Sequence, residues 1–183
     1  MSIQDIIQFI YDDTNKIILL LPIGPPGSGK TTLKNLLHTH ITNRIVISPT
    51  RDEIFQTYRL QHGLKKSRHL THQNILGQIS QLEIDYPNQN ILVYIDTTNS
   101  NPHIRQHYID VVKPNITKYI CFHTNHLDDP ISYLQNRTKD RYHPTFPKLK
   151  EEQIKTITTI LHTIQYPNND NDNDNNDSFN IYI

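Results

Sequence analysis

The stretch GPPGSGKT, residues 24–31, decides the fold of this chain of 183 residues. It fits the pattern G-x-x-x-x-G-K-[ST], in which glycines let backbone N–H groups approach an anion closely. The apolar run KIILLLP, residues 16–22, precedes it, and residues 30–40 follow with leucines spaced along one face of a helix. A strand, a glycine-rich loop and a helix in this order predict a phosphate-binding loop with the anion at the start of the helix.

The residue types of this loop indicate how a nucleoside triphosphate and its metal would be held. Backbone N–H groups of residues 27–31 can wrap the β-phosphate, and Lys30 can bridge the β- and γ-phosphates. The Thr31 hydroxyl is a hard oxygen ligand of the kind that Mg²⁺ prefers. We therefore expect Mg²⁺ and ATP or GTP as cofactors. The nucleotide-binding residues predicted from the loop are Gly24, Gly27, Ser28, Gly29, Lys30, Thr31 and Thr32.

Strands and helices alternate along the rest of the chain. Continuous apolar runs predict strands at residues 16–22, 44–47, 90–96 and 118–123. Helical spacing of apolar residues predicts helices at 3–11, 30–40, 52–61, 69–84, 101–112, 129–136 and 150–164. The alternation predicts an α/β protein of the P-loop NTPase fold, with a central parallel sheet of four to five strands, helices on both faces and ligands at the carboxyl ends of the strands.

Length and composition set the domain organisation and the compartment. Residues 1–166 are predicted to form one P-loop domain, and the Asn- and Asp-rich tail 167–183 to be disordered because it carries too little apolar surface. Lys plus Arg and Asp plus Glu number 18 each, so any nucleic-acid binding must come from local basic clusters. The single Cys121 predicts a reducing compartment. No apolar run approaches roughly 18 residues, which predicts a soluble intracellular protein, cytoplasmic or nuclear, that binds no membrane; the oligomeric state stays open.

Two acids follow predicted strands, where a parallel sheet gathers its functional groups. Asp52 comes after the second strand and is the candidate general base, because a carboxylate can accept the proton of an attacking hydroxyl. Its alternative role is that of an acid near the positive end of a helix. Asp96 ends the third strand and is the candidate metal residue together with Thr31, the alternative being a turn residue.

Basic side chains near these acids suggest further contacts. Arg137 and Arg141 are four residues apart, which predicts an arginine-bearing lid that closes over the triphosphate, or else a solvated turn. Arg105 follows the polar turn 97–102 and is expected to face substrate or solvent. The cluster of Lys65, Lys66 and Arg68 lies in a predicted connection and would suit the phosphates of a polynucleotide end, or is ordinary surface charge.

Four local patterns, taken in order, resemble the 5′-hydroxyl polynucleotide kinase family, including the kinase module of fungal-type tRNA ligases and of phage end-healing enzymes. They are GPPGSGKTT (24–32), TRDEIFQTYR (50–59), DTTNSNPHIR (96–105) and RTKDRYHPT (137–145). The resemblance implies that Asp52 is the general base and that Arg141 contacts the nucleotide phosphates. It also implies metal or substrate contacts by the segment holding Asp96, Thr98 and Asn99. The HPT sequence is similar to the tRNA-ligase type and favours RNA as substrate.

The chain departs from the family pattern at two points. Phe55 stands three residues after the base, where family members often carry arginine, and Arg59 is the expected replacement. The family segment D-T-N reads D-T-T-N here, so either Asp96 or Thr97 occupies the position of the family's aspartate.

These observations predict a kinase that transfers the γ-phosphate of ATP or GTP to the 5′-hydroxyl end of RNA or DNA, with RNA favoured, in nucleic-acid end healing and repair. The alternatives are a kinase of small metabolites and a nucleotide-binding module without catalysis. The predicted catalytic residues are Lys30, Asp52 and Arg141; the predicted substrate-binding residues are Arg51, Arg59, Thr98, Asn99 and Arg105; Arg137 joins the nucleotide site, and Thr31 with Asp96 forms the metal site.

Overall fold

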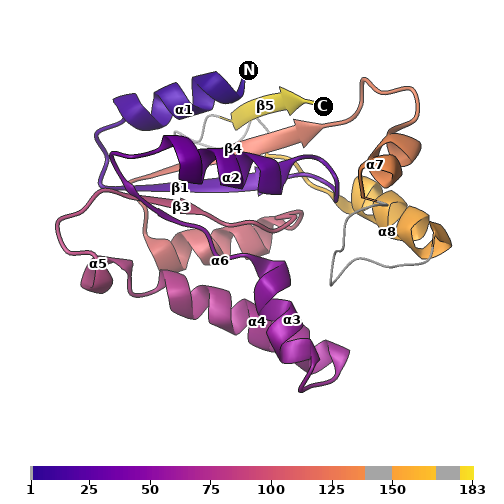
Figure 1. The fold of residues 1–183 in the computed structure, drawn as a ribbon, viewed down its shortest axis with the longest axis horizontal. Helices are drawn as coiled ribbons and strands as arrows, with labels where there is room; N and C mark the ends of the chain where they lie inside the picture. Colours follow the sequence, from indigo (N-terminus) through magenta and orange to yellow (C-terminus); the bar gives the residue numbers. More distant parts are fainter. Residues whose placement is uncertain (1, 139–149, 168–177) are drawn as a thin grey trace.

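The computed structural model describes residues 2–138, 150–167 and 178–183 (Figure 1). Its sheet has five parallel strands in the order β2-β3-β1-β4-β5. The strands are β1 (Ile17–Ile23), β2 (Ile45–Ile47), β3 (Ile91–Tyr94), β4 (Ile116–His123) and β5 (Ser178–Tyr182). The four strands expected from apolar runs are therefore confirmed, and β5 is added at one edge.

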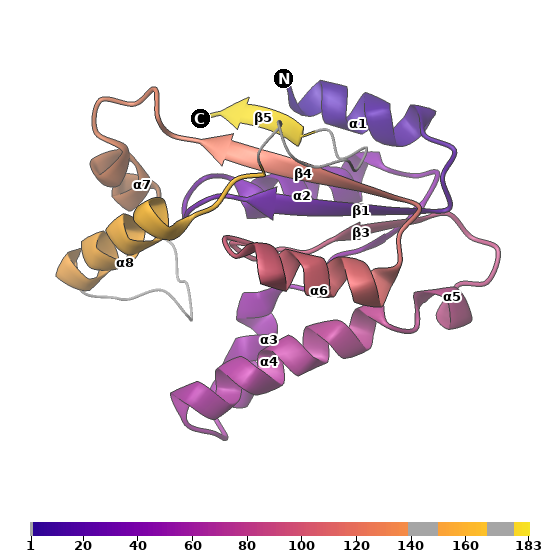
Figure 2. The same ribbon diagram turned by 180° about the vertical axis from the view of Figure 1, so that it is seen from behind.

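Helices cover both faces of this sheet, as predicted (Figures 1 and 2). They are α1 (Ile3–Asp12), α2 (Lys30–His40), α3 (Arg51–Arg59), α4 (Leu64–Ile79), α5 (Leu82–Asp85), α6 (Pro102–Val112), α7 (Pro130–Thr138) and α8 (Lys150–Thr163). α1 and α2 pack on one face and α4 and α6 on the other, while α7 and α8 lie beyond the carboxyl ends of the strands. None of the helices described has both the length and the apolar character needed to cross a membrane.

The central strand β1 is buried along its whole length, which positions the loop that follows it. Alternate side chains enter opposite cores: Leu19 and Leu21 face the α6 side, and Ile18 and Leu20 face the α2 side. A strand buried on both faces reads as a continuous apolar run, which explains why the sequence predicted it. Because β1 lies between β3 and β4, the phosphate loop emerges at the middle of the sheet's carboxyl edge.

The prediction that residues 167–183 are disordered is wrong for the last six residues. β5 pairs with β4 in parallel register, from Tyr119↔Ser178 to His123↔Tyr182. Phe179 is buried and meets Phe9 of α1 edge to face, with ring centroids 5.2 Å apart. The sequence analysis missed this short strand because it follows directly on the Asn- and Asp-rich segment 168–177 and was grouped with it. That segment lies outside the described residues.

The fourth helix also differs from the prediction, which placed it at residues 69–84. α4 begins at Leu64, and a break at Ser80 and Gln81 separates it from the single turn α5. Ser67 near its start is fully buried and donates a hydrogen bond to the carbonyl of Gly63, at 3.0 Å. Residues 65–68 are therefore helical, and the cluster of basic residues expected in a connection is carried by a helix instead.

A substitution in β5 tests whether this strand is an integral part of the fold. We expect Phe179→Ala to lower the free energy of unfolding by about 3 kcal/mol, because it empties a buried aromatic site. Urea denaturation of the full chain measures this, and Leu60→Ala, at a side chain that is 85% exposed, is the control expected to cost under about 1 kcal/mol. Equal effects of the two variants would contradict the structural assignment of β5.

Candidate active site

The phosphate loop needs its glycines for two different reasons. Gly27 and Gly29 have φ angles of 82° and 106°, a region that side chains disfavour. Gly24 lacks space instead, since a Cβ there would lie 2.8 Å from Cβ of Phe122 in β4 and 2.8 Å from Oγ of Ser28. The loop is thus held against the sheet at its start and turns through left-handed conformations before α2 begins.

Lys30 is buried at the first position of α2 and folds back over the loop. Its Nζ donates hydrogen bonds to the carbonyls of Gly24 (2.9 Å) and Pro25 (2.7 Å) and to Oγ of Ser28 (3.2 Å). Burial lowers the pKa of Lys30 to about 8, although the charges of Asp96 and Asp52 act in the opposite direction. The ammonium is therefore poised where an incoming anion would stabilise its charged form.

Thr31 and Asp96 meet at the end of β3, as the metal prediction requires. The Thr31 hydroxyl donates to Oδ2 of Asp96 at 3.1 Å. Burial raises the pKa of Asp96, and the charges of Lys30 and Lys34 oppose this. Within the described ranges no three His, Cys, Asp or Glu side chains gather into a metal cluster. A hydroxyl and a carboxylate, both hard oxygen ligands, thus lie together here, which fits Mg²⁺, an ion that usually takes its remaining ligands from phosphates and water.

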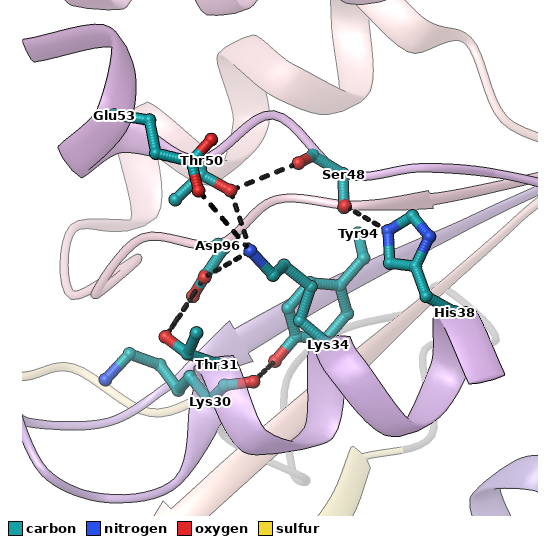
Figure 3. Close-up of polar contacts among 9 residues, drawn as sticks. All are labelled: Lys30, Thr31, Lys34, His38, Ser48, Thr50, Glu53, Tyr94 and Asp96. Atoms are coloured by element: carbon teal, nitrogen blue, oxygen red, sulfur yellow. Dashed lines mark hydrogen bonds and ion pairs between the residues drawn. The ribbon is translucent and has the colours of Figure 1, made fainter.

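Lys34, one turn after Lys30 on α2, ties this acid to the start of α3 (Figure 3). Its Nζ donates to Oγ1 of Thr50 at 3.0 Å and lies 3.9 Å from Oδ2 of Asp96. It also lies 4.0 Å from a carboxylate oxygen of Glu53. Thr50 makes no side-chain cap for α3. The sequence analysis did not single out Lys34, because its partners come from two other elements.

Asp52 lines the same cavity as the phosphate loop, as the sequence analysis expected. The cavity has a volume of about 500 Å³, and Lys30, Thr31 and Asp96 also line it. Asp52 raises the pKa values of both Lys30 and Asp96, so its charge acts on the loop and on the metal position. Nη1 of Arg51 lies 4.0 Å from Oδ1 of Asp52 and shares the cavity wall. Asp52, Arg51 and the phosphate loop therefore line one space.

Asp96 and Thr97, the two candidates for the position of the family's aspartate, make different contacts in the turn after β3. Asp96 reaches Thr31, whereas the Thr97 hydroxyl donates to Oδ1 of Asn99 within the turn. Asn99 is itself buried, and its Nδ2 donates to the carbonyls of Pro22 and Ile95. Asn99 thus joins the ends of β1 and β3, and both Asn99 and Thr98 line the cavity.

Two predicted substrate-binding arginines do not lie in the cavity wall. Arg105 is buried and donates to the carbonyls of Asn99 (2.8 Å) and Gln165 (2.9 Å), so the expectation that it faces substrate or solvent is wrong. It fastens the turn after β3 to the segment that follows α8. Arg59 is exposed at the end of α3 and donates to the carbonyl of His62, at 3.4 Å, away from the lining residues.

The remaining predicted residues also differ in whether they lie near the cavity. Thr32 is exposed and does not line the cavity. Arg137 belongs to α7, donates to the Tyr133 hydroxyl at 2.9 Å and approaches the loop, since a Cβ on Gly29 would lie 3.8 Å from its Nη2. Arg141 lies outside the described residues.

Several cavity residues were missed because they come from helices whose facing the sequence could not fix. α4 contributes His72, α6 contributes Tyr108, and α8 contributes Thr156 and Ile160. Arg68 of α4, which the sequence analysis named as a candidate phosphate contact, lines the cavity as well. His72 and Tyr108 have ring centroids 5.7 Å apart. The one available signal was the basic cluster before residue 69, which would have pointed to the cavity had the start of α4 been placed correctly.

Comparison with known proteins supports the fold. No family model and no curated protein sequence matches the chain. Among solved structures it is similar to a fungal RNA kinase (TM-score 0.58, 19% identity, 93% of this chain and 76% of that one covered). It is also similar to a chain of the Pnkp1/Rnl/Hen1 RNA repair complex (0.56, 18%, 83% and 46%) and to shikimate kinase from Acinetobacter baumannii bound to shikimate (0.51, 13%, 81% and 75%). The chain therefore has the P-loop NTPase fold of kinases.

The buried ammonium predicts a pH dependence of anion binding. A pKa lowered from 10.5 to about 8 leaves Lys30 neutral above pH 8, so binding there must take up a proton. We expect the affinity for ADP, measured by calorimetry in EDTA, to fall roughly tenfold between pH 7.5 and pH 9. Lys30→Arg keeps its charge throughout and should give a flat profile. A flat profile for the unaltered protein would show that the Lys30 charge does not control binding.

Proposed function

We propose that the protein is a Mg²⁺-dependent kinase that transfers the γ-phosphate of ATP or GTP to the 5′-hydroxyl end of a polynucleotide, RNA in preference to DNA. One observation carries the proposal: the carboxylate of Asp52 lines the cavity that also contains Lys30 and the Thr31–Asp96 pair. A binding module would need the loop alone. An acid across from the loop is what a phosphotransferase needs in order to activate a hydroxyl.

On the donor side, the loop amides and Lys30 hold the phosphates. Lys30 exchanges its contacts with the carbonyls of Gly24 and Pro25 for phosphate oxygens, which stabilise the charged ammonium better than neutral carbonyls do. Arg137 lies beside Gly29 and supplies a planar cation for the same oxygens. Arg141 is proposed for a similar role on the strength of the sequence resemblance.

The metal position is formed by Thr31 and Asp96. When bound there, Mg²⁺ neutralises charge on the transferring phosphoryl group. Thr31 offers its hydroxyl oxygen as a ligand, and the buried Asp96 offers its carboxylate or holds a ligand water. Lys34 keeps Asp96 beside the start of α3, which maintains the separation between the metal position and Asp52.

On the acceptor side, Asp52 accepts the proton of the attacking hydroxyl and orients it toward the γ-phosphorus. Arg51 balances the charge of this acid at 4.0 Å and lines the cavity where the acceptor enters. The 5′-hydroxyl polynucleotide as acceptor is supported by the sequence patterns at residues 50–59, 96–105 and 137–145. The similarity to a fungal RNA kinase agrees with it, while shikimate kinase has the same fold and acts on a small metabolite.

The decisive experiment separates catalysis from binding. With γ-labelled ATP or GTP and a 5′-OH oligoribonucleotide, we expect label on the oligonucleotide, and Asp52→Asn should lower kcat about 10²- to 10⁴-fold with little change in nucleotide affinity. Glu53→Gln is the matched control, because this neighbouring acid is 78% exposed and should leave kcat nearly unchanged.

Other outcomes would redirect the assignment. Label on a metabolite from a small-molecule pool, with none on RNA or DNA, would favour a metabolite kinase. Nucleotide binding without transfer to any acceptor would favour a module without catalysis, and full activity of Asp52→Asn would remove this acid from the mechanism.

The metal position gives a second test. Asp96→Asn should raise the Mg²⁺ concentration for half-maximal transfer about 10- to 100-fold, because the amide is a poorer partner for the metal and its waters. Asp110→Asn on the exposed face of α6 is the control. Metal titrations of both variants at saturating nucleotide measure the effect, and coinciding curves would exclude Asp96 from the metal site.

A further inference from the structure

α4 carries three basic residues, Lys65, Lys66 and Arg68, whose contacts differ from those of the other cations near the cavity. Lys30, Lys34 and Arg105 are all engaged by carbonyls, hydroxyls or carboxylates. Lys65, Lys66 and Arg68 are exposed on α4 and form no hydrogen bond or ion pair within the part of the chain that the structure describes. Because the whole chain has no net charge, this local excess is available to an anion that approaches the cavity.

The helical geometry of α4 determines which of these three cations lie on the side of the helix that faces the cavity. Arg68 lines the cavity, and His72 four residues later lines it too, which fixes the side of α4 that faces the cavity. On an ideal helix Lys65 lies roughly 60° around the axis from Arg68, and Lys66 lies roughly 160° from it. Lys65 and Arg68 therefore share one side, whereas Lys66 points away from the cavity.

Their spacing suits successive charges on one strand. Lys65 precedes Arg68 by one turn, roughly 4.5 Å along the axis, toward the outer end of α4. A row of three side chains, Lys65, Arg68 and His72, thus runs along this side of α4, with His72 at its inner end. Burial and the charges of His107 and His69 lower the pKa of His72, which leaves its ring neutral at pH 7. The charged members of the row are thus Arg68 at the cavity wall and Lys65 outside it.

We infer that this side of α4 is a phosphate track for the acceptor strand: Arg68 contacts the first phosphate after the 5′-hydroxyl end, and Lys65 contacts the second. The inference rests on the proposed function and deepens it. With its hydroxyl at Asp52, the terminal nucleoside occupies the cavity, and the strand leaves past Arg68 toward the start of α4. Backbone phosphates position a strand without reading its sequence, so the track gives length selectivity and no base preference.

The test counts phosphates on the acceptor. The probes are a nucleoside 3′-monophosphate, with one phosphate, and a 5′-OH tetraribonucleotide that also carries a 3′-phosphate and therefore has four. Arg68→Gln should raise KM for both acceptors, and Lys65→Gln should raise KM about three- to fivefold for the tetranucleotide alone. Lys66→Gln, on the same turn and also exposed, is the matched control and should change neither value. kcat should stay the same in all three variants, since none of the side chains touches the reacting atoms.

Salt dependence gives an independent readout. For the tetranucleotide, the slope of log(kcat/KM) against log salt should become shallower by about 0.7 in Lys65→Gln, the value for one lost phosphate contact on a single strand. Equal behaviour of Lys65→Gln and Lys66→Gln, with normal transfer by the unaltered protein, would overturn the track alone. Failure of the unaltered protein to phosphorylate any 5′-OH acceptor would overturn both the track and the proposed function.

Discussion

The shape of the phosphate loop depends on one interaction, the burial of the Lys30 ammonium group against the loop's own oxygens. Nζ of Lys30, at the start of α2, is removed from water, and three oxygens of the loop that follows the fully buried β1 compensate for the lost solvation. The neighbouring elements hold this arrangement in place: Gly24 packs on Phe122 of β4, and the buried Tyr94 hydroxyl of β3 donates to the carbonyl of Lys30 at 2.8 Å. The loop is therefore shaped before an anion arrives, which lowers the cost of ordering it on binding.

The helix that begins at Lys30 also sets the distances within the rest of the site. Lys30, Thr31 and Lys34 occupy little more than one turn of α2, and they face the loop, Asp96 and the start of α3 respectively. A single rigid helix thus relates the proposed donor, metal and acceptor positions, and a rigid element holds such groups more closely than separate loops could. The Lys34 ammonium contacts both Asp96 and Thr50, the residue before α3. The position of the proposed base, Asp52, is therefore coupled to that of Asp96 in the proposed metal site.

The sequence predicted the parts of the site that depend on local pattern. β1 and α2 are visible because two-sided burial and helical spacing leave regular apolar patterns, and the placement of Asp52 near the loop follows from the shared carboxyl edge of parallel strands. Long-range contacts were not visible. β5 is ordered by pairing with β4, and Arg105 is satisfied by the carbonyl of Gln165, 60 residues away, so its burial could not be deduced from its own neighbours.

The choice of acceptor must therefore come from what surrounds the common core. Shikimate kinase has the same fold, so neither the loop nor the sheet distinguishes a small acceptor from the end of a strand. A small acceptor is satisfied inside the cavity, where Arg51 already balances Asp52. Charge outside the cavity then serves no purpose for it, whereas a polynucleotide carries its next phosphate beyond the cavity wall. Lys65 is exposed one turn outside Arg68 on α4 and has no ion pair among the residues that the structure describes, and the proposed preference for a strand over a metabolite rests on this side chain.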